Sequence, residues 1–327
     1  MAVEVHDITS REQWLELRKP YITASTIGGL PAFNCHSYVT PLRIYAEKRG
    51  VEFDDGSDDK VKRRGRWLEP AVAKAVSELR PEWGLIQPNV FLCDPETGLG
   101  ATPDYYITGD PRGLGVLQCK TVAYSVWKRE WDEGKDIPFW VTLQCLTECM
   151  LADAAFGVVA VLLVDPHNMD AVILDVPRHT GAEAKIVNEV KRFWGDIRNS
   201  VEPQADFARD GAVLKLLIPR ERAKDATLDL TGNNELPNLF ARRAAMIAEM
   251  KKYKQRCSII ETKLMEIMGD NAIATGLDGW GITYRVEPRK AYSVAAKTPR
   301  VLRIRDQRPV EQRPQVNGED VDDDEED

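Results

Sequence analysis

The chain has 327 residues, of which 43% are apolar and 29% are charged, which is typical of a globular protein. This length suits one large domain with a smaller module. The longest apolar run, Gly157–Val164, is too short to cross a bilayer, and the first residues show no basic segment followed by an apolar block. We therefore expect neither a membrane-spanning helix nor a signal peptide, and a cytoplasmic location.

The net charge of −8 is distributed unevenly. The last nine residues, "EDVDDDEED", contain eight acids, so the rest of the chain balances to zero. Residues 285–313 instead carry nine lysines and arginines against three acids. A basic arm followed by an acidic tail is compatible with a nucleic-acid partner. A solvated surface and a disordered solubilising tail account for the same charges.

Six cysteines are scattered along the chain without a CxxC pair. Structural zinc sites need thiolates and imidazoles clustered at short fixed spacings. The pattern therefore favours reduced cysteines in the protein core.

The N-terminal third is predicted to contain three helices, at 11–19, 40–50 and 67–80. The second has Pro41 in its first turn and a glycine at its end. The third has apolar residues at helical spacing and Glu69 in its first turn. The charged segment 51–66 has the composition of a turn.

The middle of the chain alternates between strand and helix patterns. Strands are predicted at 89–93, 104–108, 115–123, 157–164 and 171–176, and helices at 138–152 and 180–197. This order predicts an α/β layer with a mixed sheet flanked by helices.

After residue 203 the chain reads as an extended connector, then a long helix from about 237 to 268. The apolar residues of that helix form a narrow stripe, typical of a coiled coil or a docked helix. A two-stranded unit is predicted from Gly279 onward. We expect a core at 1–205, a connector at 206–235, an appendage with the basic arm at 236–313 and a disordered acidic tail at 314–327.

The segment "DYYITGDPRGLGVLQCK" predicts a hairpin that gathers polar side chains. With the turn centred near Pro111, facing residues have numbers that sum to 222, so Asp104 lies opposite Gln118. Lys120 lies two residues further along the same strand face. An ordinary solvent-facing hairpin edge is the alternative interpretation.

These residue types suit a hard cation such as Mg²⁺, which binds oxygen ligands. Asp104 supplies a carboxylate, Gln118 an amide oxygen, and Cys119 a backbone carbonyl. Glu69 can add a second carboxylate if its helix packs on the sheet. Lys120 can orient an attacking water or stabilise charge at phosphorus. The set therefore predicts metal-assisted phosphodiester hydrolysis.

Five stretches, in order, are "LRKPYITASTIGGLPAF", "GRWLEP", "ATPDYY", "LQCKT" and "IPFWVTLQCLTECML". Together they resemble the YqaJ/lambda-exonuclease family of the PD-(D/E)XK nuclease superfamily, over about residues 10 to 200. The resemblance implies a restriction-endonuclease-like core, here followed by the long helix and the small β unit.

The resemblance also implies an activity: a phage recombination exonuclease that degrades one strand of duplex DNA 5′→3′ with Mg²⁺, which Mn²⁺ can replace, leaving 3′ overhangs. The implied location is the cytoplasm of the bacterial host. Family members can form ring-shaped homotrimers and work with a single-strand annealing protein.

By this resemblance Glu69, Asp104 and Lys120 match catalytic positions. Arg18 and Ser25 match groups that hold the 5′-phosphate of DNA, and Gln144 matches a glutamine near the scissile end.

The sequence departs from the family pattern at Gln118, where a glutamate is usual. Its neutral amide should bind a cation less tightly than a carboxylate does, although some superfamily members resemble this chain in carrying glutamine there. We expect an active nuclease. The alternatives are a DNA-end-binding module with weak or no catalysis and a restriction-like endonuclease.

Overall fold

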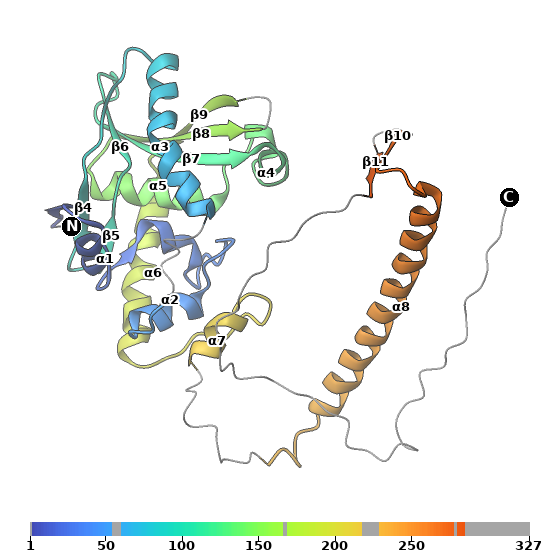
Figure 1. Ribbon diagram of the computed structural model, residues 1–327. Coiled ribbons are helices and arrows are strands. Elements are labelled where there is room, and N and C mark those ends of the chain that lie inside the picture. The colour runs from blue at the N-terminus through green and yellow to red at the C-terminus, as the bar shows by residue number, and fades with distance from the viewer. Residues whose placement is uncertain (1, 54–59, 166–168, 218–228, 278–279, 285–327) are drawn as a thin grey trace. The chain divides into compact units, whose positions relative to one another are not determined.

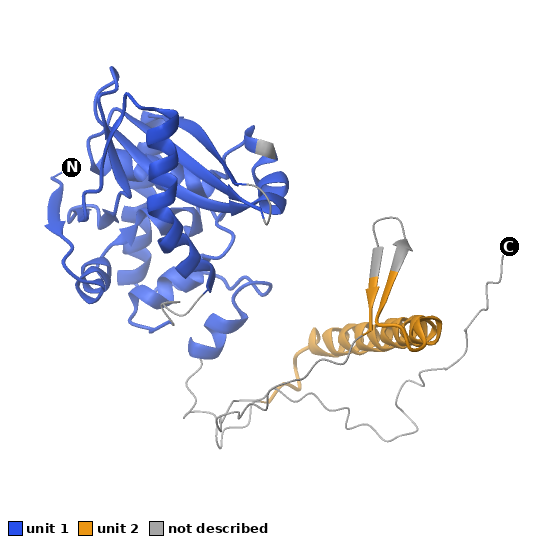
Figure 2. Ribbon diagram, turned by 45° about the horizontal axis from the view of Figure 1, so that its top comes forward, with its two compact units in different colours: residues 1–219 blue, residues 220–327 orange. Residues whose placement is uncertain are grey.

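The computed structural model describes residues 2–53, 60–165, 169–217, 229–277 and 280–284 (Figure 1). The chain divides into two compact units, Met1–Pro219 and Arg220–Asp327 (Figure 2). The basic arm and the acidic tail expected after residue 285 lie outside the described residues.

The first unit is built on a five-stranded sheet. Its strands, in spatial order, are β3 (Gly84–Ile86), β6 (Tyr105–Thr108), β7 (Gly115–Ala123), β8 (Phe156–Val164) and β9 (Met169–Pro177). The β7–β8 pair is parallel, and the other neighbouring pairs are antiparallel. The predicted mixed sheet is therefore confirmed.

Helices cover both faces of this sheet (Figure 1). Val158 and Ala160 of β8 are buried in a cluster with residues of α3 (Lys60–Leu79). Val159 and Val161 are buried in another cluster with residues of α5 (Phe139–Leu151) and α6 (Thr180–Arg198). Because successive side chains of a strand point to opposite faces, the continuous apolar run of β8 suits a strand covered on both sides.

A second, four-stranded sheet lies beside α1 (Arg11–Arg18) and the 3₁₀ helix η1 (Ala24–Gly29). Its order is β1 (Glu4–Asp7), β4 (Val90–Asp94), β5 (Leu99–Ala101) and β2 (Ile22–Thr23). The strand predicted at 89–93 thus belongs to this sheet and not to the sheet of the hairpin. η1 packs closely on α5, since a Cβ at Gly28 would lie 2.6 Å from the Cβ of Trp140.

Two expectations for the first unit are wrong in detail. α3 begins at Lys60, because the basic residues expected to form a turn are good helix formers and continue the helix ahead of Pro70. The expected extended connector contains α7 (Gly211–Leu217). Val213 of α7 is buried against α2 (Pro41–Lys48), and Thr40 Oγ1 donates a hydrogen bond to the buried carboxylate of Asp210. Among the short elements that were not predicted from the sequence are also α4 (Tyr124–Glu130) and η2 (Asp132–Gly134).

The described part of the second unit contains α8 (Leu236–Met268) and an antiparallel hairpin of β10 (Ile273–Leu277) and β11 (Trp280–Thr283). The long helix predicted from the sequence is confirmed, and large apolar side chains such as Met250 and Ile267 are exposed along it. The predicted small β unit is present, but its first strand precedes the segment from which it was predicted. Within the described parts of the chain, no helix is long and apolar enough to span a membrane.

Candidate active site

The β6–β7 hairpin forms in the predicted register. Pairs that sum to 222 face each other: Tyr105 with Leu117, Tyr106 with Val116, and Ile107 with Gly115. Directly before β6, Asp104 accepts two hydrogen bonds on the same oxygen. Gln118 Nε2 donates to Asp104 Oδ2 at 2.6 Å, and the Cys119 amide donates to it at 2.8 Å. These donors fix the orientation of the carboxylate.

Gln144 of α5 connects this pair to the lysine. Its Oε1 accepts from Lys120 Nζ at 3.0 Å, and its Nε2 donates to Gln118 Oε1 at 2.9 Å. The same Nε2 donates to Glu148 Oε1, also at 2.9 Å. Asp104, Gln118 and Lys120 are therefore joined on the α5 side of the sheet, through an amide that is buried.

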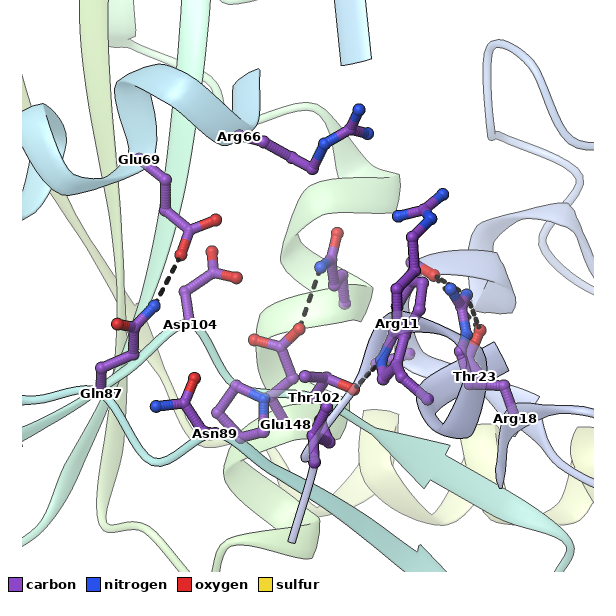
Figure 3. Close-up of a pocket in the computed structure, with 16 residues that line it drawn as sticks. Arg11, Arg18, Thr23, Arg66, Glu69, Gln87, Asn89, Thr102, Asp104 and Glu148 are labelled. Carbon is purple, nitrogen blue, oxygen red and sulfur yellow. Dashed lines mark hydrogen bonds between the residues drawn. The ribbon is translucent and has the colours of Figure 1, made fainter. Parts of the chain in front are cut away.

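A cavity of about 480 Å³ opens above this network (Figure 3). Glu69 projects into it from α3 and accepts from Gln87 Nε2 at 3.3 Å. Acidic and basic side chains both line the cavity: Glu69, Asp104 and Glu148, and Arg11, Arg18 and Arg66. The cavity can thus present oxygen ligands and positive charges to one bound molecule.

The basic side of the cavity is built around Arg18. Its guanidinium lies 4.1 Å from the ring centroid of Trp14, and its Nη2 donates to Thr23 Oγ1 at 3.2 Å and to Ser25 Oγ at 3.3 Å. Trp14 is held in turn by a 3.0 Å hydrogen bond from Nε1 to Thr102 Oγ1. Burial lowers the pKa of Arg18. Since an arginine titrates far above neutral pH, this preoriented group remains a cation that suits an anion.

Burial raises the pKa of each acid in the cavity. For Glu69 burial and, after it, the charge of Asp104 raise the pKa to about 7. Burial also raises the pKa of Asp104, against the opposing effects of Lys120 and of the Cys119 amide. The pKa of Glu148 lies well above its ordinary range, through burial first and the charge of Asp104 second. Buried carboxylates that repel one another are stabilised in their charged form by a cation.

The donor set fits a hard divalent cation. Carboxylates and the carbonyl of Cys119 are ligands that Mg²⁺ accepts. Moreover, Glu148 Oε2 is buried without a hydrogen-bond partner among the described residues. Such an orphaned acceptor is costly unless something binds to it. Gln118 differs from the expectation in one respect: its amide oxygen faces Gln144, and its nitrogen faces Asp104.

The structure brings most of the predicted residues to this one cavity. Glu69, Asp104, Arg18, Ser25 and Gln144 line it, and hydrogen bonds join Gln118, Cys119 and Lys120 to lining residues. Gln144, which the resemblance places near the scissile end, lines the cavity together with Arg18 and Ser25, and it is hydrogen-bonded to Lys120 and Gln118.

Other residues that line the cavity were not predicted from the sequence, among them Arg11, Trp14, Arg66 and Glu148. One signal was available for Glu148, because it is the single acid in a strongly apolar helix, one turn after Gln144.

A second group of possible metal ligands lies outside this cavity. Ligand atoms of Glu4, His6 and Cys93 lie within 4.8 Å of one another, on β1 and β4. The expectation of core cysteines is confirmed for Cys93, Cys145 and Cys149, which are buried, and is wrong for Cys257, which is exposed.

Residues 13–155 match the family model of the YqaJ-like viral recombinase domain, and every residue that we predicted for the site falls within this range. No curated protein sequence matches the chain. An alkaline exonuclease, LHK-Exo, from Laribacter hongkongensis is similar in structure at 19% identity, covering 62% of this chain and 99% of its own, with a TM-score of 0.44. A phage-related exonuclease from Haemophilus somnus 129PT is similar at 11% identity over 57% of this chain and 98% of its own, with a TM-score of 0.40.

The expected resemblance to the YqaJ/lambda-exonuclease family is confirmed by this match of residues 13–155 to the YqaJ-like viral recombinase domain.

Proposed function

We propose that this protein is a Mg²⁺-dependent exonuclease that degrades one strand of double-stranded DNA from its 5′ end. The products are nucleotides and duplexes with 3′ single-stranded overhangs, which serve phage-type recombination. The proposal rests on the recombinase family of residues 13–155 and on the resemblance of the sequence to exonucleases of that family.

One observation carries the chemistry: Asp104, Gln118, Gln144 and Lys120 form a continuous hydrogen-bonded set beneath the cavity. In this proposal Asp104, Glu69 and the Cys119 carbonyl hold the cation, with Gln118 beside them. A divalent cation bound there supplies charge neutralisation at the scissile phosphate and a more acidic water.

Lys120 is the proton-handling and charge-stabilising group of the proposal. Gln144 Oε1 accepts from its ammonium at 3.0 Å, and the ring centroid of Trp140 lies 5.3 Å from Nζ. These contacts restrict a long, flexible side chain to the α5 side of the sheet. There the ammonium can orient an attacking water and donate to the negative charge that develops at phosphorus.

Arg18 and Ser25 supply the proposed 5′-phosphate site. The guanidinium is oriented by Trp14 on its face and by two hydroxyls at its edge. Planar guanidinium groups bind phosphate through paired donors. A site for the terminal phosphate close to the proposed catalytic groups would explain cleavage from an end.

The test is hydrolysis of linear duplex DNA that carries a 5′-phosphate and a label on either the 5′ or the 3′ end. We expect Mg²⁺-dependent release of the 5′ label first, no release with a chelator, and a loss of about 100-fold or more in Lys120→Ala. Lys74→Ala, at a lysine that is exposed on α3, is the matched control and should be as active as the wild type. Equal rates of DNA hydrolysis in the wild type and in Lys120→Ala would contradict the proposal that this protein is a nuclease.

A DNA-end-binding module is the second candidate, favoured by the way the Gln118 amide is engaged on both sides. It predicts end binding that weakens steeply with salt, without turnover, and a gain of cleavage in Gln118→Glu. Cleavage of closed circular DNA would instead indicate a restriction-like endonuclease, because an exonuclease needs an end.

The proposed partners are duplex DNA ends and, by resemblance, a single-strand annealing protein and further copies of this chain in a ring-shaped trimer. Light scattering on the purified protein measures the last of these directly.

A further inference from the structure

Glu148 is a buried acid that the proposed catalysis has not yet used. It lies in α5 with 1% of its surface exposed, and it lines the same cavity as Asp104. One of its oxygens accepts from Gln144 Nε2, while Oε2 has no partner among the residues that the structure describes. Figure 3 shows its carboxylate directed into the space beside Asp104.

An unpaired buried carboxylate is expensive for a fold. A buried acceptor left without a donor costs about 1 to 3 kcal/mol, and more if it is charged. Replacement by glutamine would keep the shape and remove the charge, so packing alone gives no reason for an acid here. A bound cation would satisfy the free oxygen.

The neighbouring amides explain where that cation would lie. Gln144 Nε2 donates to both Gln118 Oε1 and Glu148 Oε1, so the three side chains are adjacent. Gln118 stands where the family pattern usually has a glutamate, and its oxygen is already engaged. Position 118 on β7 therefore has no carboxylate, whereas position 148 on α5, on the other side of Gln144, has one.

We propose that Glu148 is a ligand of the catalytic cation, and that it supplies from α5 the second carboxylate that Gln118 does not supply from β7. This inference rests on the proposed function, since it assigns a ligand of that same site. Gln118 and Glu148 together carry one negative charge. A glutamate at position 118 of β7 with a neutral residue at position 148 of α5 would carry the same charge.

The test is Mn²⁺ binding, measured by the paramagnetic resonance signal of the free ion, with the metal-free melting temperature as a second readout. The proteins are wild type, Asp104→Asn, Glu148→Gln, Gln118→Glu and the double variant Gln118→Glu/Glu148→Gln. Glu78→Gln is the matched control, because Glu78 is an exposed acid of α3 outside the cavity.

We expect Glu148→Gln to weaken Mn²⁺ binding about tenfold or more, since ligand charge sets affinity at such sites. Its metal-free melting temperature should rise, because a buried unpaired acid is removed. The double variant should bind within about threefold of wild type, because the carboxylate count is restored. Glu78→Gln should leave binding unchanged.

Three outcomes would overturn the proposal. If Glu148→Gln binds Mn²⁺ like wild type while Asp104→Asn does not, the cation site is real but Glu148 is not a ligand. If Glu148→Gln lowers the metal-free melting temperature, and the double variant binds Mn²⁺ no better than Glu148→Gln, then Glu148 stabilises the folded protein and is not a ligand. If the wild type binds no Mn²⁺, this inference and the proposed metal-dependent nuclease fail together.

Discussion

Gln144 is the residue on which the geometry of the site depends most, and Gln144→Leu tests that dependence. The substitution nearly preserves volume and removes three hydrogen bonds, to Lys120, Gln118 and Glu148. Bonds to charged partners contribute about 1.5 to 3 kcal/mol each and the neutral one about 1 kcal/mol, so the gross loss is about 4 to 7 kcal/mol.

Two effects reduce that figure. Lys120 is half-buried and regains water when it is released, whereas Gln118 and Glu148 are buried and do not. The leucine also gains apolar burial, worth roughly 1 to 2 kcal/mol. We therefore expect the free energy of unfolding to fall by about 2 to 4 kcal/mol. Nuclease activity should also fall, even at temperatures where the variant is folded, because Lys120 loses its hydrogen bond to Gln144.

Urea unfolding followed by tryptophan fluorescence measures the loss. The matched control is Gln87→Leu, since Gln87 is exposed and makes a single 3.3 Å bond to Glu69. It should change stability by less than about 1 kcal/mol. If Gln144→Leu is as stable as this control and keeps full activity, the hydrogen-bonded set is not what organises the site.

Three further predictions follow from single contacts. Gly28→Ala should destabilise the protein by about 1 to 3 kcal/mol, because the new Cβ would lie 2.6 Å from the Cβ of Trp140. The control Gly195→Ala should stabilise the protein, because a Cβ at this helix position meets no atom within 4 Å. Equal melting temperatures of the two variants would contradict this prediction. Burial lowers the pKa of His36 to about 4. Between this pKa and its ordinary value, His36 is therefore protonated in the unfolded chain and neutral in the folded protein. The contribution of His36 to the free energy of unfolding should be fully present above about pH 6.5, and up to about 3 kcal/mol of it should be lost as the pH falls to 4. In His36→Asn, the free energy of unfolding measured with urea should depend less on pH over this range. Arg18→Lys should weaken binding of 5′-phosphorylated duplex ends about tenfold and of 5′-hydroxyl ends much less, by fluorescence anisotropy; an equal loss for both would remove the phosphate role.

The hairpin could be predicted from the sequence because its register is set locally. The turn residues between Asp104 and Gln118 fix which positions face each other, and no distant segment has to be known. The same reasoning places Lys120 on the face of Gln118. The long helix α8 was also predictable, since its length and stripe are properties of one segment.

What the sequence left open depends on contacts between distant segments. Strand β4 pairs with β1 across more than eighty positions of sequence, as Glu4 with Cys93, and joins a separate sheet. α7 is short, and it is identified as part of the first unit by the burial of Val213 on α2. The sequence marks Glu148 as the single acid of an apolar helix, but its place beside Asp104 depends on the packing of α5 on β7, which helical periodicity does not reveal.

The most direct measurement is anomalous diffraction from a crystal soaked with Mn²⁺. We predict a peak about 2 Å from a carboxylate oxygen of Asp104, within reach of Glu148 and close to Lys120. A peak found only beside Glu4, His6 and Cys93, with none at Asp104, would contradict the proposed metal-assisted cleavage.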